Sequence, residues 1–121
     1  MAATVSIVKC PGYQEDIVYQ KVKEAVDLVG GISSFVSPGE KVLLKPNLLI
    51  GRPPEKCVTT HPLVVKAVAQ MVREAGAVPL IGDSPQLDSA QKACDKCGIG
   101  EVARELGIEI VEFEPVDVQN P

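Results

Sequence analysis

TTHPLVVKAVAQMVREAGAVPLIGDSP, residues 59–85, is the stretch of sequence that decides the fold. Between Pro62 and Ala75 its apolar residues recur at spacings of three and four, which predicts a helix with one apolar side. Gly76 ends this helix. A short apolar strand follows at positions 80–81, and the turn sequence GDSP stops it. A helix that leads directly into a buried strand is typical of α/β proteins with parallel strands.

The same alternation of strand and helix extends to both sides of this stretch. The predicted strands are Val5–Val8, Val42–Leu44, Leu80–Ile81 and Ile108–Phe113, and the predicted helices are Asp16–Val29, Pro62–Ala75, Ala90–Cys97 and Val102–Leu106. Right-handed crossovers then give a three-layer α/β fold, with a mainly parallel sheet of about four strands and helices on both faces. Val42–Leu44 is apolar on both faces, which predicts a central strand. The glutamates of Ile108–Phe113 favour an edge position for the last strand.

Composition and charge limit the possible functions. The chain has 121 residues, of which 45% are hydrophobic, enough for one core. The formal net charge is −4 and the lysines and arginines are scattered, so we expect no nucleic-acid partner. No uncharged stretch reaches the ~20 residues needed to cross a bilayer, and the first ten residues lack the layout of a signal peptide. We therefore expect one cytoplasmic α/β domain over residues 1–121, with no membrane partner.

Polar side chains gather where the predicted strands end, and parallel topology brings all of them to the carboxyl edge of the sheet. They are Lys45 and Asn47 after the second strand, Thr59, Thr60 and His61 at the start of the second long helix, and Asp83 and Ser84 after the third strand. A lysine beside a helix N-terminus favours a phosphate or carboxylate, because free N–H groups and the helix dipole both attract negative charge. The sequence thus predicts a site for a small anionic ligand.

In this interpretation Lys45, Thr59, Thr60 and Ser84 hold the ligand and Asn47 orients it. His61 or Asp83 would transfer a proton or contact a metal. Each residue also has a plain structural interpretation. Thr60 can cap the helix, Asn47 can form a turn, Lys45 can be a solvated charge, His61 can be a structural donor, and Asp83 with Ser84 can cap the next segment. The long connection between the second strand and the second long helix can be a flap over the site.

Four cysteines are present, at Cys10, Cys57, Cys94 and Cys97. Cys94 and Cys97 form a C-x-x-C pair, but they also complete an apolar helical stripe, so core packing is the favoured interpretation. A metal site of four thiolates stays conceivable, although the irregular spacing argues against it.

Three motifs carry a resemblance to a known family: KVLLKPNLL from Lys41 to Leu49, TTHPLVVKAVAQMVREAGA from Thr59 to Ala77, and GDSP from Gly82 to Pro85. In this order and at these spacings they resemble the amino-terminal portion of the uncharacterised family called domain of unknown function 362. Gln86 departs from the glycine that relatives often have at this position, which argues against close ligand approach at that turn. A fainter, topological similarity is to the amino-terminal domain of the nickel-dependent lactate racemases.

The resemblance implies that the chain is an amino-terminal fragment of a larger, iron-sulfur-associated protein. Many such proteins carry a C-terminal ferredoxin-like segment that binds four-iron clusters, and this segment would be a partner of the domain. Cys94 and Cys97 do not match its cluster motif, so the cofactor of this chain is unknown. Three hypotheses follow: binding of an anionic ligand, docking of a missing domain without catalysis, or a cysteine-based metal or redox site. None of them decides whether the chain is an enzyme.

Overall fold

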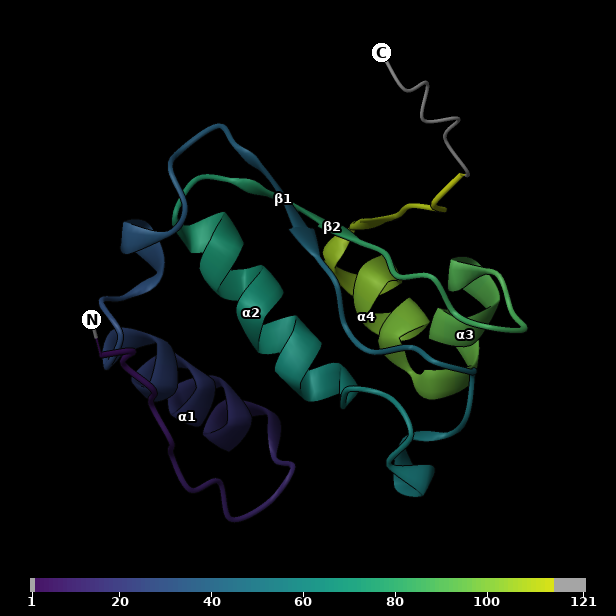
Figure 1. The fold of residues 1–121 in the computed structure, drawn as a ribbon, viewed down its shortest axis with the longest axis horizontal. Coiled ribbons are helices and arrows are strands. Elements are labelled where there is room, and N and C mark those ends of the chain that lie inside the picture. The colour runs from purple at the N-terminus through teal and green to yellow at the C-terminus, as the bar shows by residue number, and fades with distance from the viewer. Residues whose placement is uncertain (1, 115–121) are drawn as a thin grey trace.

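The computed structural model describes residues 2–114 and shows an α/β domain with a parallel sheet, which confirms the predicted fold class (Figure 1). Its helices are α1 (Glu15–Asp27), α2 (Pro62–Glu74), α3 (Ala90–Cys97) and α4 (Ile99–Leu106), its 3-10 turns are η1 (Ile32–Ser34) and η2 (Pro54–Lys56), and its strands are β1 (Lys41–Leu44), β2 (Val78–Ile81) and β3 (Glu109–Ile110). The helices begin and end close to the predicted residues.

The sheet of the described residues has three strands rather than about four, in the order β1-β2-β3. Residues 4–9, which we call the arm, contain the segment predicted to be the first strand. The arm is extended but pairs with no described strand, so that prediction is wrong. It runs beside α1, where the Ser6 hydroxyl donates a hydrogen bond of 2.7 Å to the Ala25 carbonyl (Figure 1). Its β-branched residues favour an extended backbone, but they do not specify a partner strand.

β2 is the central strand and β1 lies at an edge, so the predicted central position of Val42–Leu44 is also wrong. Pro79 occupies the second position of β2, opposite Val42. A proline is tolerated there because its missing N–H would point away from β1. On that side β3 reaches only as far back as the partner of Leu80, so no ladder hydrogen bond is lost.

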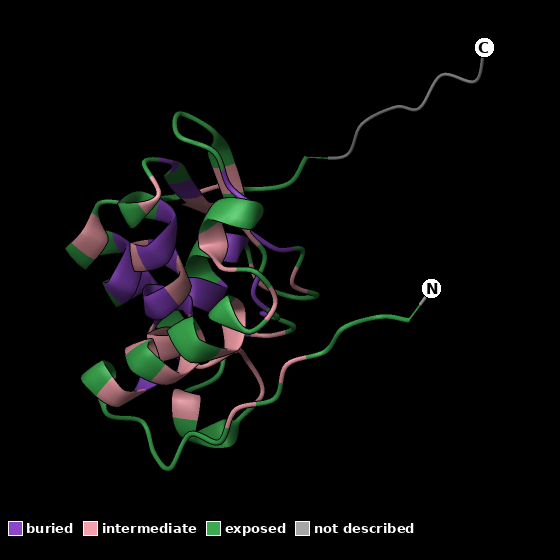
Figure 2. Ribbon diagram, turned by 90° about the vertical axis from the view of Figure 1, so that its left-hand side faces the viewer, coloured by how far each residue is buried: buried purple, intermediate pink, exposed green. Residues whose placement is uncertain are grey.

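All four described helices lie on one side of the sheet, which corrects the expectation of helices on both faces. Leu44, Ile81 and Ile110 belong to or pack against one core with residues of α2, α3 and α4. These three residues lie opposite one another in the parallel register, so they share a face. α1 packs against α2 rather than against the sheet. Figure 2 shows that the buried residues gather mainly in the helices, while the arm is exposed or half-buried along its length.

The opposite face of the sheet is bare in residues 2–114. Leu43 is 45% exposed and Val78 is 50% exposed, although both lie within strands. Glu109 continues this exposed row, opposite the half-buried Leu80. A parallel sheet normally has both faces covered. In residues 2–114, only one face of this sheet is covered by helices.

Candidate functional site

The carboxyl ends of β1 and β2 bring Lys45 and Asp83 together. Lys45 Nζ lies 2.8 Å from Asp83 Oδ1, and the Leu48 N–H donates to Asp83 Oδ2 at 3.0 Å. Asp83 is 8% exposed, whereas 63% of the Lys45 side chain is exposed. Burial alone would raise the pKa of Asp83. The hydrogen bonds from Lys45 and from the N–H groups of Leu48 and Ser84 outweigh it and hold the pKa below its usual value.

This balance has a chemical consequence. Because the pKa of Asp83 is lowered, the carboxylate stays ionised and acts as a hydrogen-bond acceptor. A general acid needs a raised pKa near neutrality, so the environment of Asp83 does not favour that role. Contact with a cation remains compatible with an ionised carboxylate, and Lys45 already supplies one.

Asn47 and Thr60 also meet, across the ends of the long connection between β1 and α2. The Asn47 N–H donates to Thr60 Oγ1 at 3.0 Å, and the Thr60 N–H donates to the Asn47 carbonyl at 3.1 Å. The Asn47 side-chain amide donates to the Val58 carbonyl at 3.2 Å. These bonds close the connection at its base, so both residues have a structural use. Ser84 is exposed beside this edge.

His61 begins α2 as its N-cap. Its Nδ1 accepts a 3.1 Å hydrogen bond from the Leu63 N–H, and the imidazole stacks on the Tyr13 ring at a centroid distance of 3.7 Å. Burial lowers the pKa of His61, which favours the neutral acceptor form. In this geometry His61 has a structural use, as an acceptor rather than as the donor that was the alternative, and its proton-transfer or metal-contacting role stays a prediction.

The helix terminus is less open to an anion than the sequence suggested. The N–H groups of Leu63 and Val64 both bond to His61, and the Thr60 N–H is taken by Asn47. Pro62 has no N–H to offer. Thr59 Oγ1 is the exception among the polar groups, because it is buried and has no hydrogen-bond partner in the described chain.

A groove of about 330 Å³ opens next to these residues, along β1 and α2. Lys45, Pro46 and Thr60 line its polar end, and Leu43, Leu44, Val64, Val65 and Val68 line the rest. The sequence missed this groove, because a periodic pattern assigns apolar residues to a core without showing which of them stay uncovered. The adjacent pair Val64 and Val65 widens the apolar side of α2 and was the available signal.

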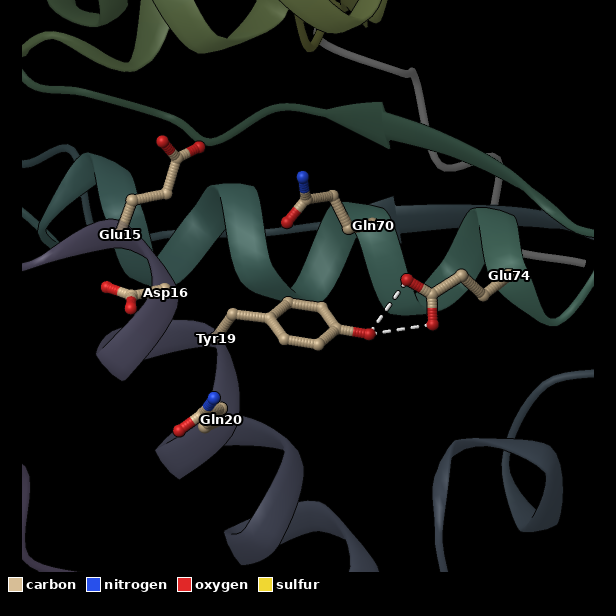
Figure 3. A pocket seen from close by; sticks show the side chains of 6 residues that line it. All are labelled: Glu15, Asp16, Tyr19, Gln20, Gln70 and Glu74. Atoms are coloured by element: carbon tan, nitrogen blue, oxygen red, sulfur yellow. Dashed lines mark hydrogen bonds between the residues drawn. The ribbon is translucent and has the colours of Figure 1, made fainter.

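A second hollow, of about 640 Å³, lies between α1 and α2, away from the carboxyl edge (Figure 3). Six polar residues line it: Glu15, Asp16, Tyr19, Gln20, Gln70 and Glu74. The Tyr19 hydroxyl donates to both oxygens of Glu74 at 2.7 Å, and this bond is the main reason that the pKa of Tyr19 rises to about 12. Nearby, Lys66 contacts Glu15 of α1 and Glu105 of α4. These contacts hold the helices together, so the hollow is a seam between them.

The cysteines do not fit an iron-sulfur cluster. Cys94 and Cys97 are fully buried in the core, as the favoured interpretation of the sequence held, and burial raises the pKa of Cys94 to about 12. A buried thiol with a raised pKa stays protonated, whereas metals bind thiolates. Cys10 and Cys57 are exposed. Within residues 2–114 no three His, Cys, Asp or Glu side chains are placed to share a metal ion.

Comparison with known proteins identifies a longer relative. The chain is 42% identical over 114 residues to a thylakoid-associated protein of Synechocystis sp., an alignment that covers 93% of this chain and 35% of that protein. The chain thus spans about a third of that relative. No solved structure matches, so the similarity to lactate racemases stays a prediction. So does the cytoplasmic location, although no described helix is long and apolar enough to cross a membrane.

Residues 42–121 match the family described as domain of unknown function (DUF362). They include the Lys45–Asp83 pair, the groove and the whole of the sheet apart from Lys41. The family match covers well over half of the chain. This protein therefore belongs to the DUF362 family.

Proposed function

We propose that this domain is a docking module, and that the bare face of its sheet is covered by an apolar helical layer from a further part of the polypeptide. One observation carries the proposal: Leu43 and Val78 are about half exposed in adjacent strands, whereas the residues on the other face of the same strands lie in the core. Full burial of an exposed Leu or Val side chain stabilises a protein by roughly 1.5–3 kcal/mol, so a side chain that is already half buried gains roughly half of that. A layer that covers this face therefore gains free energy at several positions.

The length of the Synechocystis relative supports this proposal, since about two thirds of it lies outside the alignment with this chain. Helices are the usual cover of a parallel sheet, because the crossover connections place them there. We further propose that the ferredoxin-like segment implied by the family resemblance belongs to that part, because the cysteines of this chain do not fit a cluster.

The test measures binding between this chain and the part of the Synechocystis relative outside the aligned residues, expressed separately, by isothermal titration calorimetry. Val78→Asp places a charge on the bare face and is expected to weaken binding at least tenfold, since a desolvated charge is costly. Leu28→Asp is the matched control, because Leu28 is 61% exposed but lies at the end of α1. Equal binding by the two variants, or no binding by the unaltered chain, would contradict the proposal.

A second function, the binding of a small anionic ligand, is favoured by the polar end of the groove. Lys45 and Thr60 both line it, and the neighbouring Thr59 Oγ1 has no partner in the described residues. The Lys45 ammonium has further donors beyond the one that faces Asp83. Titration with phosphate and small carboxylates tests this function. Saturable binding that disappears in Lys45→Ala is expected, and the absence of saturable binding or an unchanged affinity in the variant would refute it.

A further inference from the structure

The outer edge of β1 has unused backbone hydrogen-bonding groups. The carbonyls of Glu40 and Leu44 accept from the N–H groups of Val78 and Gly82 on the β2 side. Because alternate residues of a parallel strand bond to the same neighbour, the N–H and C=O of Leu43 point the other way. In residues 2–114 no strand lies on that side of β1. The edge is therefore a free template for another strand.

The apolar groove lies along this same edge. Val64, Val65 and Val68 of α2 line it beside Leu43 and Leu44, so its apolar part is continuous with the core face of the sheet. A strand that paired with β1 would place every second side chain into the groove. The groove therefore has the position and the apolar lining of a binding site for a β-strand.

The arm lies against α1, the helix that packs on α2. A smaller hollow, of about 280 Å³, separates it from α1 and is lined by Ser6, Val8 and the apolar side of α1, including Val22 and Val26. On its outer side Val5 is 77% exposed and Ile7 is 89% exposed. An extended segment with β-branched residues exposed in alternation has the pattern of a strand without a partner.

Spacing explains why the arm and β1 do not pair. The arm lies against α1 and β1 lies against α2, and the two helices pack directly on each other (Figure 1). Packed helices are about 8–10 Å apart, whereas paired strands are only about 4.8 Å apart. The arm and β1 therefore lie on different helices, too far apart to pair with each other, and the gap between them is wide enough for a strand.

We propose that a β-strand from the further part of the polypeptide inserts between the arm and β1 and pairs with both. This strand carries apolar side chains in alternation toward α1 and α2. It also carries acidic residues near its ends, because Lys9 and Lys41 flank the gap and have no ion-pair partner within residues 2–114. The inference deepens the proposed docking function and rests on it, but it assigns a separate contact, through the edge of the sheet rather than through its bare face.

Two substitutions at one position separate pairing through the backbone from contact through the side chain. Leu43→Pro removes the outward N–H, while the bonds of its neighbours to β2 stay, and proline is accepted in an edge strand whose N–H faces outward. Leu43→Ala removes the same side chain but keeps the N–H. The binding partner is again the part of the Synechocystis relative outside the alignment. Leu43→Pro is expected to bind about tenfold more weakly than Leu43→Ala, because one ladder bond is lost and its acceptor is left buried.

Amide hydrogen exchange in the unaltered chain gives a second measurement, independent of how the proline variant folds. The N–H groups of Leu43 and of the arm are expected to exchange at least tenfold more slowly when the partner is bound. Equal affinities of the two Leu43 variants, or unchanged exchange at Leu43, would overturn strand insertion. Dimerisation of the free chain that Leu43→Pro abolishes would also overturn it, because the occupant would then be a second copy. A loss of binding in Val78→Asp with unchanged exchange at Leu43 would leave only docking on the face.

Discussion

Removal of Asp83 is expected to destabilise the domain more than removal of its partner Lys45. The reason is the difference in burial, since Asp83 is 8% exposed and 63% of the Lys45 side chain is exposed. After Asp83→Ala the ion pair is lost and the N–H groups of Leu48 and Ser84 lose their acceptor inside the protein. After Lys45→Met the carboxylate keeps those two donors.

The magnitudes follow from these contacts. An ion pair with one exposed partner contributes at most about 1 kcal/mol, so we expect a loss of that size for Lys45→Met. A buried donor left without an acceptor costs about 1–3 kcal/mol. Asp83→Ala leaves two such donors, partly reached by water, in addition to the lost pair, so we expect a loss of about 2–4 kcal/mol. Asp83→Asn keeps an acceptor and should lie between the two variants.

Urea unfolding followed by circular dichroism measures these differences in the free energy of unfolding. The pH dependence provides an internal check. The pKa of Asp83 is lower in the folded chain than in the unfolded one, where aspartate titrates near ~3.9. Its contribution is therefore complete at neutral pH and is lost as the pH falls below about 4. The difference in the free energy of unfolding between the unaltered chain and Asp83→Asn should therefore become smaller as the pH falls. A loss for Lys45→Met as large as that for Asp83→Ala would refute the reasoning from burial.

Three further outcomes follow from other contacts. Glu74→Gln should bring the pKa of Tyr19 down from about 12 toward 10, because the hydrogen bond to the carboxylate is its main cause, and tyrosinate absorbance in an alkaline titration measures this shift. His61→Ala should lower the free energy of unfolding by about 0.5–2 kcal/mol through the lost N-cap, whereas His61→Asn should not. That loss should shrink as the pH falls below about 6.5, because the lowered pKa of His61 stabilises the folded state only while the unfolded histidine is neutral. A thiol reagent should label two cysteines in the native chain, and Cys94 and Cys97 only after unfolding; labelling of all four in the native chain would contradict the buried core.

The helices could be predicted well because their signals are local. Pro62 and the residue before it mark the start of α2, and Gly76 adopts a positive φ of 84° just after its end. Gly98, with a φ of 87°, separates α3 from α4. Apolar spacing then identifies the buried side of each helix. Each of these signals depends on residues that are close in sequence, so the helix boundaries can be predicted without knowledge of the tertiary fold.

The sheet was harder to predict because pairing is not local. The apolar run of β1 satisfied the criterion for a central strand, yet its middle residue Leu43 is 45% exposed in the described residues. Residues 5–8 have the composition of a strand but no partner in the described residues. A sequence shows that a strand has apolar residues on both faces. It does not show whether other residues of the same chain cover both faces.

Parallel topology predicted which residues of the candidate site would meet. Local hydrogen bonds then decided which of their polar groups stay free. Parallel strands did bring Lys45 to Asp83 and Asn47 to Thr60. The N–H groups assigned to an anion, however, are used by His61 and by the closing bonds of the long connection. Such competition among neighbouring polar groups depends on ångström distances, which a pattern of residue types does not contain.

Besides Thr59 Oγ1, the unsatisfied features of residues 2–114 belong to the sheet layer. Residues of α2, α3 and α4 share one core, and α1 is held to α2 by the Tyr19–Glu74 hydrogen bonds and the Lys66–Glu15 ion pair. Within residues 2–114 the sheet, by contrast, has a bare face and a free edge at β1, and the arm pairs with no strand. A strand that paired with the edge of β1 would lie beside the groove, whose polar end is lined by Lys45 and Thr60. The two proposed functions, docking and anion binding, would then be coupled, because the segment that pairs with the edge would also lie against the proposed anion site.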